Sequence, residues 1–226
     1  DHGSGCSADG NRVVDASIYD ALLQRLQDEG GYLLDARQKQ QLQRAYWDDQ
    51  GRRTADTIAR PAAAIAEKAG FALPPDKTFL LVEENQIGKQ HLYSTEKLGV
   101  GLAVFKCHGF DDALDQVRQI FETGGKGHSC GIYSFDDEHI DRLALMAPVS
   151  RIMVRQVQSS SNAGTFTNGM PMTSSMGCGV WGGNITNENV SLKHYMNVTW
   201  VSRPIAEDKP SEAELFGEFY RATPPA

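Results

Sequence analysis

The chain has 226 residues, a hydrophobic fraction of 40% and a formal net charge of -7 at pH 7. This length suits one globular domain with a tail, and the lysines and arginines form no dense run of the kind that makes a nucleic-acid surface. No stretch approaches the roughly 18 apolar residues of a membrane span, and the polar opening lacks signal-peptide character. We therefore expect a cytoplasmic protein whose partners are small molecules or other subunits.

The first predicted elements are a strand and a helix. Residues 11–15 (NRVVD) are short and β-branched, which predicts a strand, and the following SIYDALLQRLQDEGG carries apolar side chains at helical spacing. Ser17 with Asp20 three residues later predicts a capping box, and Gly30-Gly31 ends the helix.

The remaining elements alternate in the same way. Helices are expected over residues 35–47, 54–69, 111–122 and 138–145, and strands over 78–83, 102–106, 130–135, 151–157 and 198–203. Pro61 is compatible with the second helix only as a kink or a break. The alternation predicts an α/β fold with a mainly parallel sheet flanked by helices. Residues 159–189, rich in Ser, Thr, Asn and Gly, predict a long functional loop.

The four cysteines are Cys6, Cys107, Cys130 and Cys178. They are widely spaced and include no CxxC pair, so we expect free thiols, no disulfide scaffold and no metal site. The chain begins with Asp1 rather than methionine and reaches Cys6 almost at once, which suggests a piece of a longer protein. A cysteine between glycine and serine is weak evidence for a nucleophile, because most intracellular cysteines are packing residues.

Further motifs follow Cys6 in a fixed order. They are GGYLL, STEKLG, GGKGHS, APVSRIMV, MGCGVWGGNITNENV and KHYMNV. With the opening DHGSGCS, this series resembles the CoA-acylating branch of the aldehyde dehydrogenase superfamily, including acylating sulfoacetaldehyde and succinate-semialdehyde dehydrogenases and the aldehyde domain of bifunctional aldehyde-alcohol dehydrogenases. The resemblance runs from Asp1 to about Arg203. It implies the catalytic domain of that fold without the N-terminal dinucleotide-binding domain.

The resemblance implies roles for three residues. Cys6 matches the catalytic cysteine, which forms a thiohemiacetal with the aldehyde and then a thioester that is passed to coenzyme A, with NAD or NADP as the hydride acceptor. His128 matches a histidine of the acylating branch and either moves the proton of the CoA thiol or holds the backbone or nucleotide in position. Glu96 matches the glutamate that binds the nicotinamide ribose, the alternative being a solvated surface charge. Where the family often continues with Ser-Pro, this chain has Gly99-Val100.

Arg155 departs from the family, because relatives commonly have asparagine there. Its guanidinium suits the anionic tail of an aldehyde, with Ser160 and Asn162 as further contacts, and the alternative is a surface arginine bound to solvent or a carboxylate. The surrounding loop resembles enzymes acting on succinic semialdehyde or sulfoacetaldehyde, and we favour the sulfonate. Cys178, between glycines, is expected to serve close backbone packing.

We expect a catalytic domain over residues 1–203 and a tail over 204–226 with one helix at 211–221. The strand at about 198–203 is expected to join a neighbouring subunit's sheet and to make a homo-oligomer, a dimer or a tetramer. Because no strand is followed by GxGxxG, the chain alone is expected to be inactive as a dehydrogenase. The alternatives are a non-acylating, hydrolytic aldehyde dehydrogenase domain, a cysteine hydrolase using Cys6 and His128, and a non-catalytic assembly domain.

Overall fold

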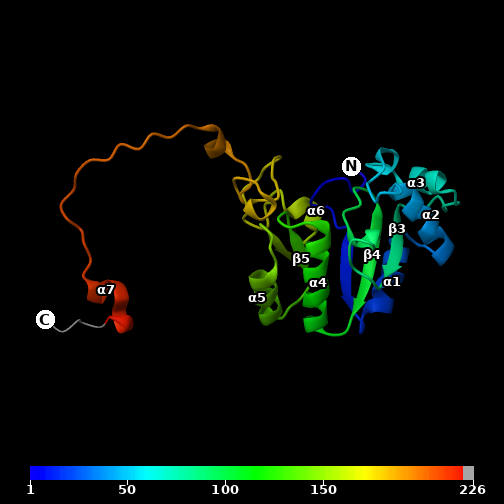
Figure 1. The fold of residues 1–226 in the computed structure, drawn as a ribbon, viewed down its shortest axis with the longest axis horizontal. Helices are drawn as coiled ribbons and strands as arrows, with labels where there is room; N and C mark the ends of the chain where they lie inside the picture. Colours follow the sequence, from blue (N-terminus) through cyan, green and yellow to red (C-terminus); the bar gives the residue numbers. More distant parts are fainter. Residues whose placement is uncertain (221–226) are drawn as a thin grey trace. The chain divides into compact units, whose positions relative to one another are not determined.

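A computed structural model describes residues 1–220 of the chain and divides it after Ser191 into two units (Figure 1). The first unit contains all the strands among the described residues. Its elements are β1 (Asn11–Asp15), α1 (Tyr19–Asp28), β2 (Gly31–Leu33), α2 (Ala36–Tyr46), α3 (Ala62–Ala69), β3 (Phe79–Glu84), β4 (Gly101–Cys107), α4 (Phe110–Gly124), β5 (Cys130–Ile132), α5 (Asp137–Met146), β6 (Ile152–Val154) and α6 (Gln158–Ser161). Short 3-10 turns lie at Ala55–Thr57, Leu92–Ser94 and Val180–Gly182.

The strands form two parallel sheets. The larger has the order β1-β4-β3-β2, with Val13 opposite Phe105 and Leu81 opposite Leu102, and the smaller pairs β5 with β6. The predicted α/β fold with parallel strands flanked by helices is confirmed, although the strands are divided between two sheets where one was expected. Parallel pairing requires crossover connections, which are supplied by α1 between β1 and β2, by α2 and α3 between β2 and β3, and by residues 85–100, with the short turn Leu92–Ser94, between β3 and β4.

Alternate side chains of the central strands belong to two hydrophobic cores, one on each face of the larger sheet. Leu80 and Val82 pack with α2 and α3 on one face, while Leu81 points to the other face and packs with α1. Figure 1 shows α2 and α3 on one side of the larger sheet, and α4 and α5 beside β5. Side chains of α4 and α5 form a third core over the smaller sheet. The two sheets are therefore held by separate hydrophobic clusters.

Several local expectations are corrected. The capping box at Ser17 is wrong, because its hydroxyl donates to the Asp15 carboxylate (2.5 Å) and Ile18, which has no capping side chain, opens α1. By contrast, the break allowed for at Pro61 in the helix expected over 54–69 is present, and Pro61 is the N-cap of α3. The strand expected over 151–157 ends at Val154, because Arg155 adopts a left-handed φ of +51°. The short strand β2 was not predicted.

The second unit begins at Leu192 and contains a 3-10 turn (Leu192–Tyr195), α7 (Glu212–Phe216) and a further turn at Gly217–Phe219. Ser211 and Glu214 form a capping box at the start of α7. Residue 221, where the predicted tail helix ends, lies outside the described residues. Residues 198–203 form no strand within the single chain. Since a strand of the expected kind needs another subunit's sheet, this strand stays a prediction.

Among residues 1–220, no helix combines the length and the apolar character needed to cross a membrane.

Candidate active site

Cys6 and His128, which are far apart in the sequence, are in contact. Cys6 is exposed in the loop before β1, and its Sγ lies 3.1 Å from Nε2 of His128 in the loop between α4 and β5. Gly127 allows the histidine loop to lie against the Cys178 loop, because a Cβ at Gly127, where φ is +121°, would overlap the Cys178 carbonyl. The close backbone approach expected around Cys178 is present.

The second ring nitrogen of His128 is held by Ser129. Nδ1 lies 2.7 Å from the Ser129 hydroxyl, which also accepts a hydrogen bond from Gln158 Nε2 (3.3 Å). Burial lowers the pKa of His128, and the charge of Arg151 lowers it further. A neutral imidazole that donates from Nδ1 to Ser129 leaves Nε2 free to accept the proton of the Cys6 thiol.

The cysteines differ in accessibility. Burial raises the pKa of the Cys107 thiol to about 11 and that of Cys130 to about 12. Both are therefore poor nucleophiles at neutral pH, because the thiolate is the reactive form. Cys6 is the exposed cysteine among the described residues.

Glu96 shares a cavity with the cysteine–histidine pair. The cavity has a volume of about 960 Å³, and its lining comes from the Cys6 loop, β1, the Glu96 turn, α4 and the His128 loop. The Glu96 side chain is exposed. Cys6, His128 and Glu96, singled out from the sequence, are thus brought together around one hollow.

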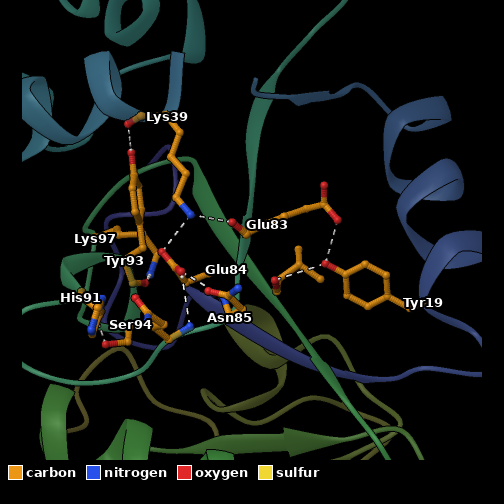
Figure 2. A network of polar contacts seen from close by, with 11 residues as sticks. Tyr19, Lys39, Glu83, Glu84, Asn85, His91, Tyr93, Ser94 and Lys97 are labelled. Carbon is orange, nitrogen blue, oxygen red and sulfur yellow. Dashed lines mark hydrogen bonds and ion pairs between the residues drawn. The ribbon is translucent and has the colours of Figure 1, made fainter. Parts of the chain in front are cut away.

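The turn that carries Glu96 is fixed by its buried neighbour Lys97. Lys97 is 2% exposed, and its Nζ donates to the carbonyls of Tyr93 (2.6 Å) and Thr95 (2.9 Å) and to Asn11 Oδ1 (2.9 Å). Figure 2 shows Lys97 beside Tyr93 and Ser94 in one polar network. All three protons of the ammonium group are used, and the turn is tied to the start of β1. Lys97 was not predicted as a site residue, although it lies within STEKLG.

Replacing Lys97 by methionine is expected to lower the free energy of unfolding by about 2 kcal/mol, because one buried and two part-buried hydrogen bonds to oxygen lose their donor. Burial, reinforced by Arg53 and opposed by Glu96, lowers the pKa of Lys97 from 10.5 to about 7. Between these two values the unfolded chain binds one more proton than the folded chain, so this group makes stability rise with pH. The difference between wild type and Lys97→Met should therefore widen from neutral to alkaline pH in urea titrations.

The exposed Lys89 provides the matched control, because Lys89→Met removes the same charge without uncovering buried oxygens. A difference between wild type and Lys97→Met that stays constant, or narrows, as the pH rises would contradict this assignment.

Arg151 is a second buried residue that was not predicted as part of the site, although it lies within APVSRIMV. It precedes β6 and is 5% exposed. Its Nε donates to Asn189 Oδ1 (2.9 Å), and its Nη1 donates to the carbonyls of Gly177 (3.1 Å) and His128 (3.4 Å). It therefore joins the histidine loop to the loop of Cys178. A charged residue at the edge of an apolar strand was the signal available in the sequence.

The three residues predicted for an anionic substrate are placed differently. The Arg155 guanidinium donates to the Ser134 carbonyl (2.5 Å) and lies over the Phe135 ring. Ser160 is exposed, whereas Asn162 is buried and donates to the Gln158 carbonyl (2.7 Å). None of the three lines the Cys6 cavity.

The Cys6 loop does contact the same segment at a neighbouring position, since the Ser7 hydroxyl donates to the Ser159 carbonyl (3.2 Å).

Known proteins that are similar to this chain in sequence and structure include several aldehyde dehydrogenases. No protein-family model matches the chain. Sulfoacetaldehyde dehydrogenase of Acholeplasma sp is 38% identical over 225 residues, which are 98% of this chain and 46% of that protein. An acylating sulfoacetaldehyde dehydrogenase of Cupriavidus necator is 36% identical over 224 residues, 97% of this chain and 45% of that protein. The crystal structure of an acetylating aldehyde dehydrogenase from Geobacillus thermoglucosidasius superposes with a TM-score of 0.82 at 30% identity, covering 92% of this chain and 46% of that chain.

The fold is therefore that of aldehyde dehydrogenases over about half of a solved chain. The chain belongs to the acylating aldehyde dehydrogenase family. It spans about half the length of the curated relatives named above.

Proposed function

We propose that this chain is the thiol-bearing catalytic domain of an NAD(P)-dependent, CoA-acylating aldehyde dehydrogenase. The observation that carries the proposal is the 3.1 Å contact between Cys6 Sγ and His128 Nε2, at a cavity that Glu96 also lines. A soft nucleophile, a neutral base within hydrogen-bond reach and an open cavity are what acyl chemistry on a thiol requires.

The first chemical step forms a carbon–sulfur bond. Cys6 Sγ attacks the aldehyde carbon while its proton passes to His128 Nε2, and the aldehyde oxygen is protonated to give a thiohemiacetal. The nicotinamide cofactor, when bound, would supply the hydride acceptor, and loss of the hydride from carbon together with loss of the hydroxyl proton to solvent converts the thiohemiacetal into a thioester. The exposed carboxylate of Glu96 suits the ribose hydroxyls of that cofactor, because it is an unburied acceptor at the same cavity.

The second step transfers the acyl group. His128 takes the proton of the CoA thiol, the CoA sulfur attacks the thioester carbon, and Cys6 Sγ leaves and regains a proton. The reverse of this step needs no hydride acceptor, since an acyl-CoA acylates Cys6 directly and releases CoA. Acyl exchange therefore tests the site in this chain itself, with acetyl-CoA or S-acetylpantetheine as the donor.

An anionic aldehyde such as sulfoacetaldehyde is the substrate class we propose. Two relatives that are 38% and 36% identical carry that activity in their names, and Arg155 follows the strand before the Ser/Asn loop. Since Arg155 contacts Ser134 and Phe135, binding an anionic tail would require its guanidinium to turn from these partners.

Arg155→Ala is expected to lower the preference of Cys6 for succinyl-CoA over butyryl-CoA by about tenfold, the worth of one charge-assisted hydrogen bond. The two acylation rates are measured by mass spectrometry and expressed as a ratio. Because both donors carry the same CoA group, its charges affect both rates equally and do not change the ratio. Arg118→Ala, at an exposed arginine paired with Asp115, is the control. An unchanged ratio in Arg155→Ala would rule out this role for Arg155.

A cysteine hydrolase is the second candidate, because the same Cys6–His128 contact is the core of such enzymes. The two functions differ in what removes the acyl group. In a hydrolase water releases it without CoA, whereas in an acylating enzyme the thioester persists until CoA is added. A hydrolase mechanism also assigns no role to the exposed Glu96, which lines the same cavity.

The expected homo-oligomer remains part of the proposal. Val198, Trp200 and Val201 are exposed in the second unit, which is what an edge strand awaiting a neighbouring sheet would present.

A further inference from the structure

Two neighbouring residues at the start of α6 contact the two sides of the reactive pair. Gln158 Nε2 donates to the hydroxyl of Ser129 (3.3 Å), and that hydroxyl oxygen lies 2.7 Å from His128 Nδ1. The backbone carbonyl of Ser159 accepts a hydrogen bond from the hydroxyl of Ser7, the residue after the nucleophile (3.2 Å). The single turn of α6 therefore reaches both the base and the loop of the nucleophile.

The start of α6 is itself held by buried hydrogen bonds. Asn162 is fully buried, and its Nδ2 donates to the carbonyl of Gln158 (2.7 Å). The carbonyl of Asn162 accepts from Nδ2 of Asn189 (3.0 Å), and Asn189 Oδ1 accepts from Arg151 Nε (2.9 Å). Because Arg151 also donates to the carbonyl of His128 (3.4 Å), these contacts form a circuit that leaves from the histidine ring and returns to its backbone. Such a network limits how far α6 can move relative to the histidine loop.

The Gln158 side chain has little freedom to move. It is 8% exposed, and its Oε1 lies against Gly131 in β5, where a Cβ would come within 2.8 Å of this oxygen. Among residues 1–220, Oε1 has no hydrogen-bond partner. Burying an amide without any hydrogen bond is costly, so the bond from Nε2 to Ser129 is the contact that holds this side chain in place.

The histidine requires an acceptor at Nδ1 when it takes a proton at Nε2. Both ring nitrogens of an imidazolium carry hydrogens, so the Ser129 oxygen must then accept a hydrogen bond from Nδ1. A serine side chain has three staggered rotamers, and only a rotamer that directs its oxygen at the ring can do this. The hydrogen bond from Gln158 favours that rotamer.

We propose that α6 is a positioning element of this site. Gln158, acting through Ser129, holds the His128 ring in the orientation that reaches the thiol. The carbonyl of Ser159, acting through Ser7, holds the nucleophile's loop against the same turn. The inference rests on the proposed function in taking these groups as the nucleophile and its base.

The first readout is the nitrogen NMR signals of the His128 ring in a chain labelled at histidine, assigned by their loss in His128→Gln. Ser129→Ala removes the partner of Nδ1 and should shift the Nδ1 signal, and Gln158→Met should shift it in the same direction. Ser129→Thr keeps the hydroxyl and should restore the wild-type signal. Gln41→Met, which loses a hydrogen bond to the Gly70 carbonyl (3.1 Å) away from the site, should leave the signal unchanged.

The second readout is the rate of acetyl transfer from acetyl-CoA to Cys6. Gln158→Met should lower this rate about fivefold to tenfold, the worth of one hydrogen bond. It should have little further effect in a chain that already carries His128→Gln, because residues that act through one another are not additive. Ser7→Ala should lower the rate by a similar factor and leave the ring signals in place.

A folded Gln158→Met chain with unshifted ring signals would overturn the inference for the histidine, as would an equal effect of Gln158→Met with and without His128→Gln. If Gln158→Met fails to fold, Gly131→Ala takes its place, because the added Cβ displaces the amide while every hydrogen-bonding group is kept. A wild-type rate in Ser7→Ala would overturn the inference for the nucleophile's loop. A wild-type chain that accepts no acetyl group would contradict the proposed function, and the ring signals alone would then decide the role of Gln158.

Discussion

Replacing Cys6 by serine is expected to abolish the transfer of an acetyl group from acetyl-CoA to this chain, with a loss of at least about 10³-fold. The hydroxyl of serine is a far weaker nucleophile than a thiol. The atom that contacts His128 Nε2 at 3.1 Å is the Cys6 sulfur, which the substitution removes. The measurement is the rate at which the intact mass gains one acetyl group.

Cys107→Ser is the matched control for this prediction, because Cys107 is buried and burial raises the pKa of its thiol to about 11. It should accept acetyl groups at the wild-type rate. Equal rates in Cys6→Ser and wild type would remove Cys6 from the mechanism.

His128→Gln should slow the same acyl transfer by about 10²-fold or more, the usual contribution of a general acid–base group. Because burial and Arg151 lower the pKa of His128, the neutral base is present above a midpoint that lies below 6.5. The wild-type rate should therefore fall as the pH drops through that midpoint, and this dependence should disappear in His128→Gln.

A histidine that only positions other groups gives a different result, in which the rate falls but the pH profile keeps its shape. This separates the two roles that the sequence leaves open. His91→Gln, outside the lining of the Cys6 cavity, should match wild type in both rate and profile.

The sequence was sufficient for the architecture because the relevant signals are local. β-branched runs separated by amphipathic helices gave the parallel arrangement, and the positions of β1, β3 and β4 follow those runs closely. The predictions that failed depended on competition between local interactions. The Ser17 hydroxyl donates to the nearby Asp15 carboxylate instead of capping the helix. Arg155 ends β6 because its backbone has a left-handed φ, which an arginine in the sequence does not predict.

The site was predictable only where residue type implied chemistry. A cysteine, a histidine and a glutamate in family order could be named, and the structure brings Cys6, His128 and Glu96 to one cavity. Arg151 and Lys97 could not be recognised in this way. Their significance lies in contacts with distant segments, at Asn189 and Asn11 respectively, and neither partner is marked in the sequence as belonging to the site.

Arg155 shows the opposite case, because an arginine beside a polar loop invited a substrate role. The structure gives its guanidinium a carbonyl and an aromatic ring as partners instead. Its proposed role now depends on the acylation ratio of Arg155→Ala.

The most direct test of the central claim is to incubate the chain with acetyl-CoA or S-acetylpantetheine, without a nicotinamide cofactor, and to map the acetyl group. We predict one acetyl group on the peptide that contains Cys6, stable in buffer and removed when free CoA is added. An acetyl group found on another cysteine, or lost to water at the same rate with and without CoA, would contradict the assignment of this chain as the acyl-carrying domain of an acylating aldehyde dehydrogenase.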